Sequence, residues 1–195
     1  MTFFLRLTQS SSSILARRIN VAEYRIDSSL IAELSPELRC GDRVLLSGTV
    51  YTARDAAHKR IVAMLEKGET LPFELEGACV YYAGPTPAPP GLPIGSCGPT
   101  TSSRMDPYAP LLLDKGLACM IGKGPRSEKV LDAIVRNKAV YLCAIGGAGA
   151  LAAQCITSCD VIAFEELGCE SVKRLTFKDF PLIVGIDCQG GSLFS

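Results

Sequence analysis

Short apolar runs alternate with helical patterns along most of this chain, and this alternation narrows its fold more than any other feature. Strands are predicted near residues 43–51, 78–83, 117–121, 139–144, 161–164 and 182–186. Helices are predicted over 54–67, 127–137 and 148–156, where apolar residues recur at helical spacing or fill the segment. Such a chain is expected to be an α/β protein, with a parallel or mixed sheet covered by helices.

Residues 84–99 interrupt this pattern with six prolines and four glycines. Proline lacks a backbone N–H group and has a fixed φ angle, so this segment cannot be a helix or a central strand. It is therefore predicted to be a shaped loop, and it leads directly into a polar block.

A chain of 195 residues that is 48% hydrophobic can bury the core of one domain of ordinary size. We expect residues 21–195 to form that single domain. Residues 1–20 differ, because they contain three arginines and a serine run but no acidic residue. They are expected to be a weakly ordered N-terminal extension, with an organellar targeting segment as the alternative.

The overall charge argues against polyanionic partners. Twenty basic and 20 acidic residues cancel, which leaves no net field to hold nucleic acid or an anionic membrane. No stretch approaches the roughly 18 apolar residues that a membrane span requires. We therefore expect a soluble, cytoplasmic protein without nucleic-acid or membrane partners.

The nine cysteines are odd in number and most lie in apolar runs, as expected for small buried residues in a reducing cytosol. No C-x-x-C pair occurs, and the nearest spacing, Cys155 and Cys159, has no histidine nearby. This chain alone is therefore not expected to bind a metal. If a metal takes part in its function, another chain must carry it.

The first chemically informative block is the strand-to-helix junction at residues 49–60, which is expected to place Arg54 in the first turn of a helix. A cation is unfavourable there, so an anion is expected to compensate it. Asp55 could do so as a structural salt bridge, or a ligand carboxylate could bind the guanidinium. His58, the single histidine, is expected to be hydrogen-bonded, partly buried and orienting rather than a proton shuttle.

The second block, residues 95–107, combines small residues with four consecutive hydroxyls from Thr100 to Ser103, followed by Arg104. Small residues allow a ligand to approach the backbone closely, and hydroxyls both donate and accept. Asp106 and Pro107 have the form of a helix N-cap and first helical residue, with Gly116 as the stop. The free N–H groups of that helix would favour an anion beside Arg104. A simple capping turn would explain the hydroxyls but not the arginine.

The third block is a lysine, Lys123, between two glycines at the end of an apolar strand, where ligands gather in α/β sheets. The P-loop spacing is absent. Residues 146–150 also lack a phosphate-binding spacing, so their glycines are expected to serve close packing of a helix against the sheet. Two arginines and a lysine at strand-to-helix junctions indicate a site for a doubly charged anion.

These blocks, in this order, resemble the beta-type subunit of the class I iron-sulfur fumarate hydratase and tartrate dehydratase family. The resemblance covers about residues 23–194. It rests on S-G-T at 47–49, A-R-D-A-A-H-K-R at 53–60, G-P-T-T-S-S-R-M-D at 98–106, G-K-G at 122–124 and D-F-P-L-I-V-G-I-D at 179–187.

The resemblance implies a swivelling β/β/α domain with mixed sheets and covering helices, paired with an alpha-type subunit in an alpha2beta2-type assembly. That subunit would hold a [4Fe-4S] cluster acting as a Lewis acid, and this chain would be inactive without it. The implied reaction is the reversible hydration of fumarate to (S)-malate. Two alternatives are the beta subunit of tartrate dehydratase and a non-catalytic dicarboxylate-binding module.

By match to the family motifs, Arg54, Arg104 and Lys123 would bind the substrate carboxylates and Thr100 would be the catalytic base. A threonine hydroxyl is a very weak acid, so its alkoxide would need a strong positive field nearby. Four further side chains are expected to hold these groups in position without binding substrate themselves: Asp55, His58, Thr101 and Asp106.

Overall fold

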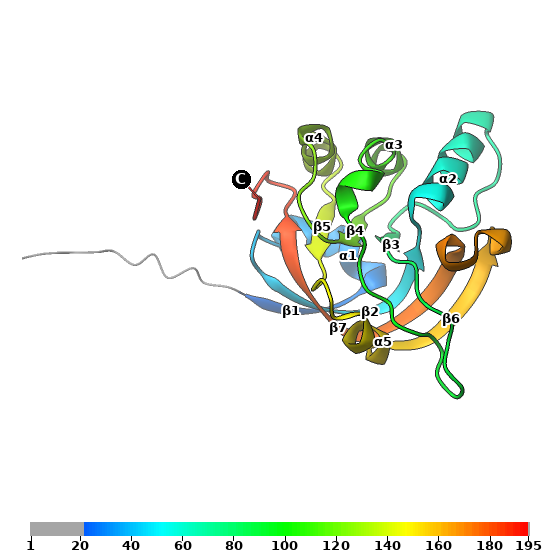
Figure 1. Cartoon of the computed structure of the whole chain (residues 1–195). Helices are drawn as coiled ribbons and strands as arrows, with labels where there is room; N and C mark the ends of the chain where they lie inside the picture. Colours follow the sequence, from blue (N-terminus) through cyan, green and yellow to red (C-terminus); the bar gives the residue numbers. More distant parts are fainter. Residues whose placement is uncertain (1–21, 195) are drawn as a thin grey trace, which may run out of the picture.

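The computed structural model describes residues 22–194 and builds them around a mixed sheet of seven strands, which confirms the predicted α/β class (Figure 1). Residues 1–20 and the role expected for them lie outside the described residues. The strands are β1 Glu23–Asp27, β2 Arg43–Thr52, β3 Cys79–Tyr81, β4 Cys119–Gly122, β5 Val140–Cys143, β6 Ile156–Ala163 and β7 Val172–Ile186.

Within residues 22–194, five α-helices connect or cover these strands: α1 Ile31–Leu34, α2 Asp55–Lys67, α3 Ala109–Asp114, α4 Glu128–Arg136 and α5 Gly149–Gln154. Four short 3-10 turns complete the described part of the chain: η1 Ser28–Leu30, η2 Ser35–Glu37, η3 Ser102–Met105 and η4 Glu165–Glu170. Within residues 22–194, no helix is long and apolar enough to cross a membrane.

The sheet closes on itself through β7. Strands β1 to β5 are parallel neighbours in chain order, whereas β7 runs antiparallel to β5, β2 and β6. Near its end, Ile183 of β7 is opposite both Arg43 of β2 and Cys143 of β5. Strands β2, β3, β4, β5 and β7 therefore form a closed ring, with β1 and β6 as the edges.

The two faces of this ring bury two separate cores. One cluster contains Tyr81, Phe177 and Phe180, together with side chains from α1 and α5. The ring centroids of Phe177 and Phe180 lie 5.9 and 5.7 Å from the ring centroid of Tyr81. The other cluster fills the space between the sheet and helices α2, α3 and α4, which lie side by side in Figure 1. Strand residues contribute alternately to the two clusters, as the period of two in a β-strand requires.

The predicted strands and helices differ from the structure mainly in the last third of the chain. Residues 182–186 are only the end of β7, which has 15 residues, and β6 begins at Ile156, where a helix was expected to end. Strand β1 and helix α1 were not predicted. Both are short, and β1 is an edge strand in which Glu23, Arg25 and Asp27 are exposed, so it lacks the apolar run of a buried strand.

The helix expected to start at Pro107 begins instead at Ala109, and Asp106 does not cap it. The Asp106 carboxylate accepts hydrogen bonds from Arg126 Nε and from the backbone N–H of Ser127, both at 2.7 Å. Asp106 therefore stabilises the start of α4, not α3. Arg54 likewise precedes α2 in extended conformation, so it is the N-cap residue and lies outside the first turn where it was expected.

Candidate functional site

The residues singled out from the sequence lie at the carboxyl ends of the parallel strands, which we call the site edge of the sheet. Arg54 follows β2, the loop to Arg104 follows β3, and Lys123 follows β4. Because these strands are parallel, their carboxyl ends share an edge, which is the usual place for a ligand site in an α/β sheet. The structure thus brings together side chains that are far apart in the sequence.

Arg54 is neutralised by a residue that the sequence did not single out. Its Nη2 atom lies 3.3 Å from Oε1 of Glu170, and 4.0 Å from Oδ2 of Asp55. The other Glu170 oxygen accepts the backbone N–H of Ala56 at 3.2 Å. Glu170 therefore supplies the anion that the start of α2 requires, since Arg54 offers no side-chain acceptor there. The uncapped helix start is the signal that indicates such an acid.

Arg54 also keeps one donor unused. Its Nε atom and Asp55 Oδ2 are buried without a hydrogen-bond partner among the described residues. The guanidinium lies against Gly84, where a Cβ atom would come within 2.9 Å of Nη1. Glycine at this position lets the arginine lie on the backbone of the loop that follows β3.

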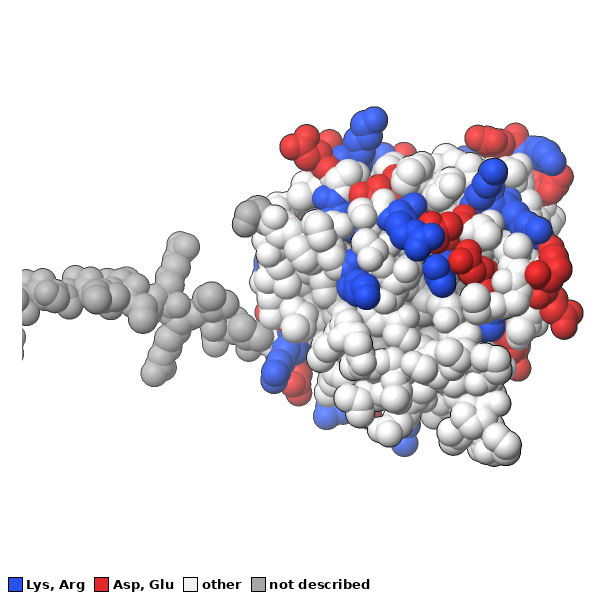
Figure 2. Space-filling view, in the orientation of Figure 1, with Lys and Arg blue, Asp and Glu red and all other residues white. Residues whose placement is uncertain are grey.

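Arg104 joins the same cluster through Asp55. Its Nε donates to Asp55 Oδ1 at 2.8 Å, and its side chain remains 52% exposed. Asp55 thus lies between the two arginines and holds their relative positions. Charged side chains of both signs gather on the upper part of the face shown in Figure 2.

The hydroxyl-rich segment is hydrogen-bonded to the G-K-G segment. The backbone N–H of Ser102 donates to the Lys123 carbonyl, and the N–H of Lys123 donates to Ser102 Oγ, both at 2.9 Å. Thr101 forms a β-bridge with Lys123, and the N–H of Thr100 donates to the carbonyl of Tyr82 at 2.7 Å. Thr100 is half-buried and Thr101 exposed, so both lie at the surface beside Lys123.

The Lys123 side chain reaches along the edge toward the turn after β5. A Cβ atom at Gly146 would lie 3.4 Å from its Cδ and 3.8 Å from its Nζ. Within residues 22–194, no carboxylate lies within salt-bridge distance of the Lys123 ammonium group. This cation is therefore available to an anionic ligand.

An ion pair with a fully buried arginine lies beneath the site edge. The Arg126 side chain is fully buried, pairs with Asp106, and lies over the rings of Tyr82 and Tyr141 at 5.3 and 5.1 Å. The Tyr141 hydroxyl lies 2.9 Å from Ser102 Oγ and 3.0 Å from the Gly124 carbonyl. Burial raises the pKa of Tyr141, so the phenol stays protonated and can donate.

His58 is fully buried, not partly as expected. Its Nδ1 donates to the Arg54 carbonyl at 2.9 Å, and its ring packs against Tyr82 with the ring centroids 5.3 Å apart. Burial lowers the pKa of His58 to about 4, so the ring is neutral at pH 7. Nε2 has no hydrogen-bond partner among the described residues.

The described cysteines are dispersed and do not gather with other metal-binding side chains. In the described part of the chain, no group of three His, Cys, Asp or Glu side chains could hold a metal ion. Burial raises the pKa of six of the cysteine thiols above its ordinary value. These are Cys40, Cys97, Cys119, Cys143, Cys155 and Cys159.

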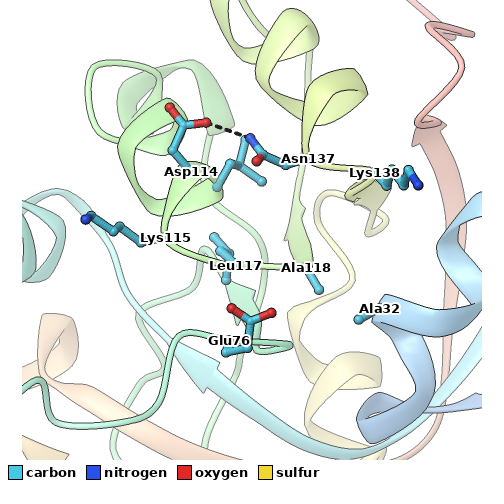
Figure 3. Close-up of a pocket in the computed structure, with 10 residues that line it drawn as sticks. Ala32, Glu76, Asp114, Lys115, Leu117, Ala118, Asn137 and Lys138 are labelled. Carbon is cyan, nitrogen blue, oxygen red and sulfur yellow. Dashed lines mark hydrogen bonds between the residues drawn. The ribbon is translucent and has the colours of Figure 1, made fainter.

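The hollow in Figure 3 lies away from this edge. It has a volume of about 460 Å³ and opens beside Ala118 and Lys138, which precede β4 and β5. Its Asp114 carboxylate is bound by Arg136 and by the Asn137 amide. It therefore lies at the amino ends of the parallel strands, and it contains none of the four residues expected to act on substrate.

Comparison with known proteins identifies the family. The family model described as Fumarase C-terminus matches residues 4–195. This chain belongs to that family. The resemblance inferred from the motifs is thereby confirmed.

Several named proteins resemble this fumarase C-terminal chain. Fumarate hydratase 2 of Leishmania major is 41% identical over 157 residues, which cover 80% of this chain and 28% of that protein. The anaerobic class I fumarate hydratase of Escherichia coli is 38% identical over 167 residues, covering 85% and 30%. The chain thus spans less than a third of the length of these two relatives.

A third relative has a length closer to that of the chain. A protein of Methanocaldococcus jannaschii, named for the beta subunit of L(+)-tartrate dehydratase, is 38% identical over 164 residues. The match covers 81% of this fumarase C-terminal chain and 84% of that relative. A separate polypeptide and a segment of a longer one therefore both occur among its relatives.

Proposed function

We propose that this chain binds the substrate of a hydro-lyase that adds water reversibly to fumarate and forms (S)-malate. The observation that carries this proposal is the set of three cationic side chains beside a threonine along one sheet edge. Fumarate has a carboxylate at each end, and two separated cationic groups can bind and orient it. The names of the relatives from Leishmania major and Escherichia coli support the same reaction.

In this proposal Arg54, Arg104 and Lys123 bind the two carboxylates. Arg54, whose side chain is 20% exposed, would donate from its guanidinium, and Lys123 from an ammonium group that has no salt-bridge partner among the described residues. Arg104 is held by Asp55 through Nε alone among the described residues, so its two outer nitrogens can still donate. Asp55 keeps the two arginines at a fixed separation.

Thr100 is proposed as the base that exchanges the proton at the substrate carbon. Its backbone is fixed by the bond to Tyr82, and the neighbouring Thr101 pairs with Lys123. The positive charges of Lys123 and Arg104 would stabilise the threonine alkoxide relative to its neutral form. Thr101, His58 and Asp106 would position these groups without contacting substrate.

We also propose that a second, alpha-type chain completes the enzyme in an alpha2beta2-type assembly and carries a [4Fe-4S] cluster. Among residues 22–194 no three His, Cys, Asp or Glu side chains are grouped so that they could hold a metal ion, which supports the assignment of the cluster to another chain. The closed ring of strands would move against that partner as one unit, as a swivelling domain does. This chain alone would then have no hydratase activity.

Substrate choice between fumarate and tartrate is tested by assaying the assembled enzyme with each. A preference for fumarate is expected, because the A-R-D-A-A-H-K-R and proline-rich segments resemble the fumarase branch. A preference for tartrate would replace this substrate with one that has additional hydroxyls. If the assembly binds either dicarboxylate but hydrates or dehydrates neither, the chain is a binding module.

The proposed binding of a substrate carboxylate by Arg104 is tested by Arg104→Ala in the assembled enzyme. Turnover is expected to fall about 100-fold or more, because the substrate loses one of its orienting contacts. Circular dichroism should show an unchanged fold, since the Arg104 side chain is 52% exposed. Arg60→Ala, which removes an exposed pair with Glu166 from α2, serves as the matched control. A near-normal rate for Arg104→Ala would remove Arg104 from the site.

A further inference from the structure

An uncharged surface borders the candidate site and is not used by it. No Asp, Glu, Lys or Arg occurs between Gly77 and Ser103 or between Ala139 and Cys159. Parts of both segments reach the surface, as the proline-rich loop and as the turn leading into α5. Figure 2 shows the lower part of one face without charged side chains except at its margins, below the charged upper part.

The loop and the helix form one packed surface. The N–H of Cys97 donates to the carbonyl of Gly149 at 2.9 Å. A Cβ atom at Gly149 would lie 2.3 Å from Ser96 Oγ and 2.9 Å from the backbone nitrogen of Gly98. Of the glycines at 146–150, only Gly149 is packed this closely, and its partner is this loop and not the sheet as expected; a Cβ atom at Gly147 would meet nothing within 4 Å. The close contact at Gly149 fixes the loop against α5.

Large apolar side chains are exposed on this surface. Leu92 is 58% exposed, Ile145 65% and Leu151 63%. We name the apolar face by its members: Leu92, Pro93, Ile145, Ala150 and Leu151. A hollow of about 290 Å³ lies between the loop and α5. Exposed apolar side chains that gather on an uncharged surface mark an interaction site.

The apolar face borders the candidate site at Ile145. Ile145 directly precedes Gly146, against which the Lys123 side chain lies. A chain that covers the apolar face would therefore also close over the Lys123 end of the site edge. Water and bulk ions would then be excluded from the cationic cluster, which strengthens its hold on an anion.

We propose that the apolar face is the docking surface for the second chain of the hydro-lyase, the alpha-type iron-sulfur chain. This inference rests on the proposed function. The match to two fumarate hydratases covers only 28% and 30% of their lengths, so most of each polypeptide lies outside the part that this chain resembles. We therefore take a chain equivalent to that remainder as the occupant. The hollow beside α5 and a second one of about 340 Å³, on the other side of the loop, would receive side chains of the partner.

The test is the double variant Leu92→Glu with Leu151→Glu, titrated against the iron-sulfur chain encoded in the same genome. Association is expected to weaken about 100-fold or more, because two charges would be buried without partners. The matched control is Leu30→Glu with Val135→Glu, which charges two exposed apolar residues outside the apolar face. The control should bind within about threefold of the wild type, since scattered surface residues contribute little.

Hydrogen exchange provides a readout that does not depend on the variants. In the wild-type complex, amides near Leu92 and Leu151 should become protected, whereas those near Leu30 should not change. Unchanged exchange at the apolar face, or unchanged binding by the double variant, would overturn the inference even if the complex is an active hydratase. A complex that assembles through this face but hydrates no dicarboxylate would overturn the proposed function alone.

Two further outcomes would also contradict the docking surface. The wild-type chains could fail to associate at all, which would remove the partner. Alternatively, sedimentation could show that this chain dimerises through the apolar face and that only dimerisation is lost in the double variant. The occupant would then be a second copy of this chain.

Discussion

At Arg54 a guanidinium occupies the position before a helix, where backbone N–H groups favour an anion. The sequence predicts a compensating acid and offers Asp55 for it. In the structure Asp55 binds Arg104 more closely, and Glu170 both pairs with Arg54 and caps α2. The need for an acid could be predicted from local rules. Its identity could not, because η4 reaches α2 only through the pairing of β7 with β2.

Glu170→Gln tests this role. The amide keeps the size of the side chain but removes the charge that faces Arg54 and the start of α2. The free energy of unfolding is expected to fall by about 1 kcal/mol, the usual effect of a lost helix cap or charged hydrogen bond. Urea denaturation measures it. Glu166→Gln, which affects an exposed pair with Arg60, should change stability less. Equal effects would contradict the capping role.

His58 predicts a pH dependence of stability. Its pKa is lowered by burial to about 4 from the ordinary 6.5. The unfolded chain therefore binds a proton between pH 6.5 and 4 that the folded chain does not. Its contribution is fully present above pH 6.5 and is lost as pH falls toward 4, amounting to roughly 3 kcal/mol.

Urea unfolding of the wild type and of His58→Leu at pH 7 and pH 5 checks this expectation. The wild type should lose more stability on acidification than the variant, because leucine cannot take up the proton in the unfolded state. The comparison of the two pH values within each protein removes the effect of the substitution itself. Parallel losses in both proteins would show that other groups control the acid sensitivity.

At the scale of elements, the most regular patterns were predicted best. Helices α2 and α4 lie within one residue of the expected ranges, because their apolar stripes face the sheet. Strand β7 was predicted only at its end. Its first part alternates apolar residues with exposed Arg174, Thr176 and Lys178, and Pro181 interrupts the pattern. A half-exposed strand of this kind gives a weaker signal than a buried apolar run.

The link between the hydroxyl-rich segment and α4 depends on one buried ion pair. Arg126→Met should lower the free energy of unfolding by about 3–5 kcal/mol, since it leaves the mostly buried Asp106 carboxylate without its charge partner. Urea denaturation measures the loss. The matched control is Arg136→Met, which removes an exposed pair with Asp114 and should cost much less.

Replacing Asp106 by leucine in the Arg126→Met background tests the cause. The double variant should recover part of the loss, because no uncompensated charge remains. Full recovery is not expected, because Asp106 also accepts the N–H of Ser127. If the double variant is less stable than Arg126→Met by the full effect of Asp106→Leu alone, the two residues act independently.

At the scale of the whole molecule, the sequence predicts the fold class but not the closure of the sheet. Parallel strands could be inferred from their alternation with helices, and so could the common edge at which Arg54 and Lys123 lie. Closure depends on β7, which pairs with β2 from the start of the chain and with β5 from its middle. Such non-local pairing leaves no local signal in the sequence.

Hydrogen exchange should reveal the special position of β7. Amides of β7 between Lys173 and Phe177 lie between β2 and β6, and they should exchange only when the whole domain unfolds. Amides of β6, which pairs with β7 alone, should exchange faster by local opening. Equal exchange in the two strands under native conditions would contradict a ring that opens only on global unfolding.

Closure also determines where the protein is exposed to self-assembly. Only β1 and β6 keep an unpaired edge among the described strands, and an open edge can recruit the same strand of another molecule into a growing fibre. Exposed Glu23, Arg25 and Asp27 on β1, and Asp160 on β6, place charges along those two edges. Because the ring leaves only these two strands open to pairing with another molecule, charges on two short stretches of sequence are enough to oppose aggregation.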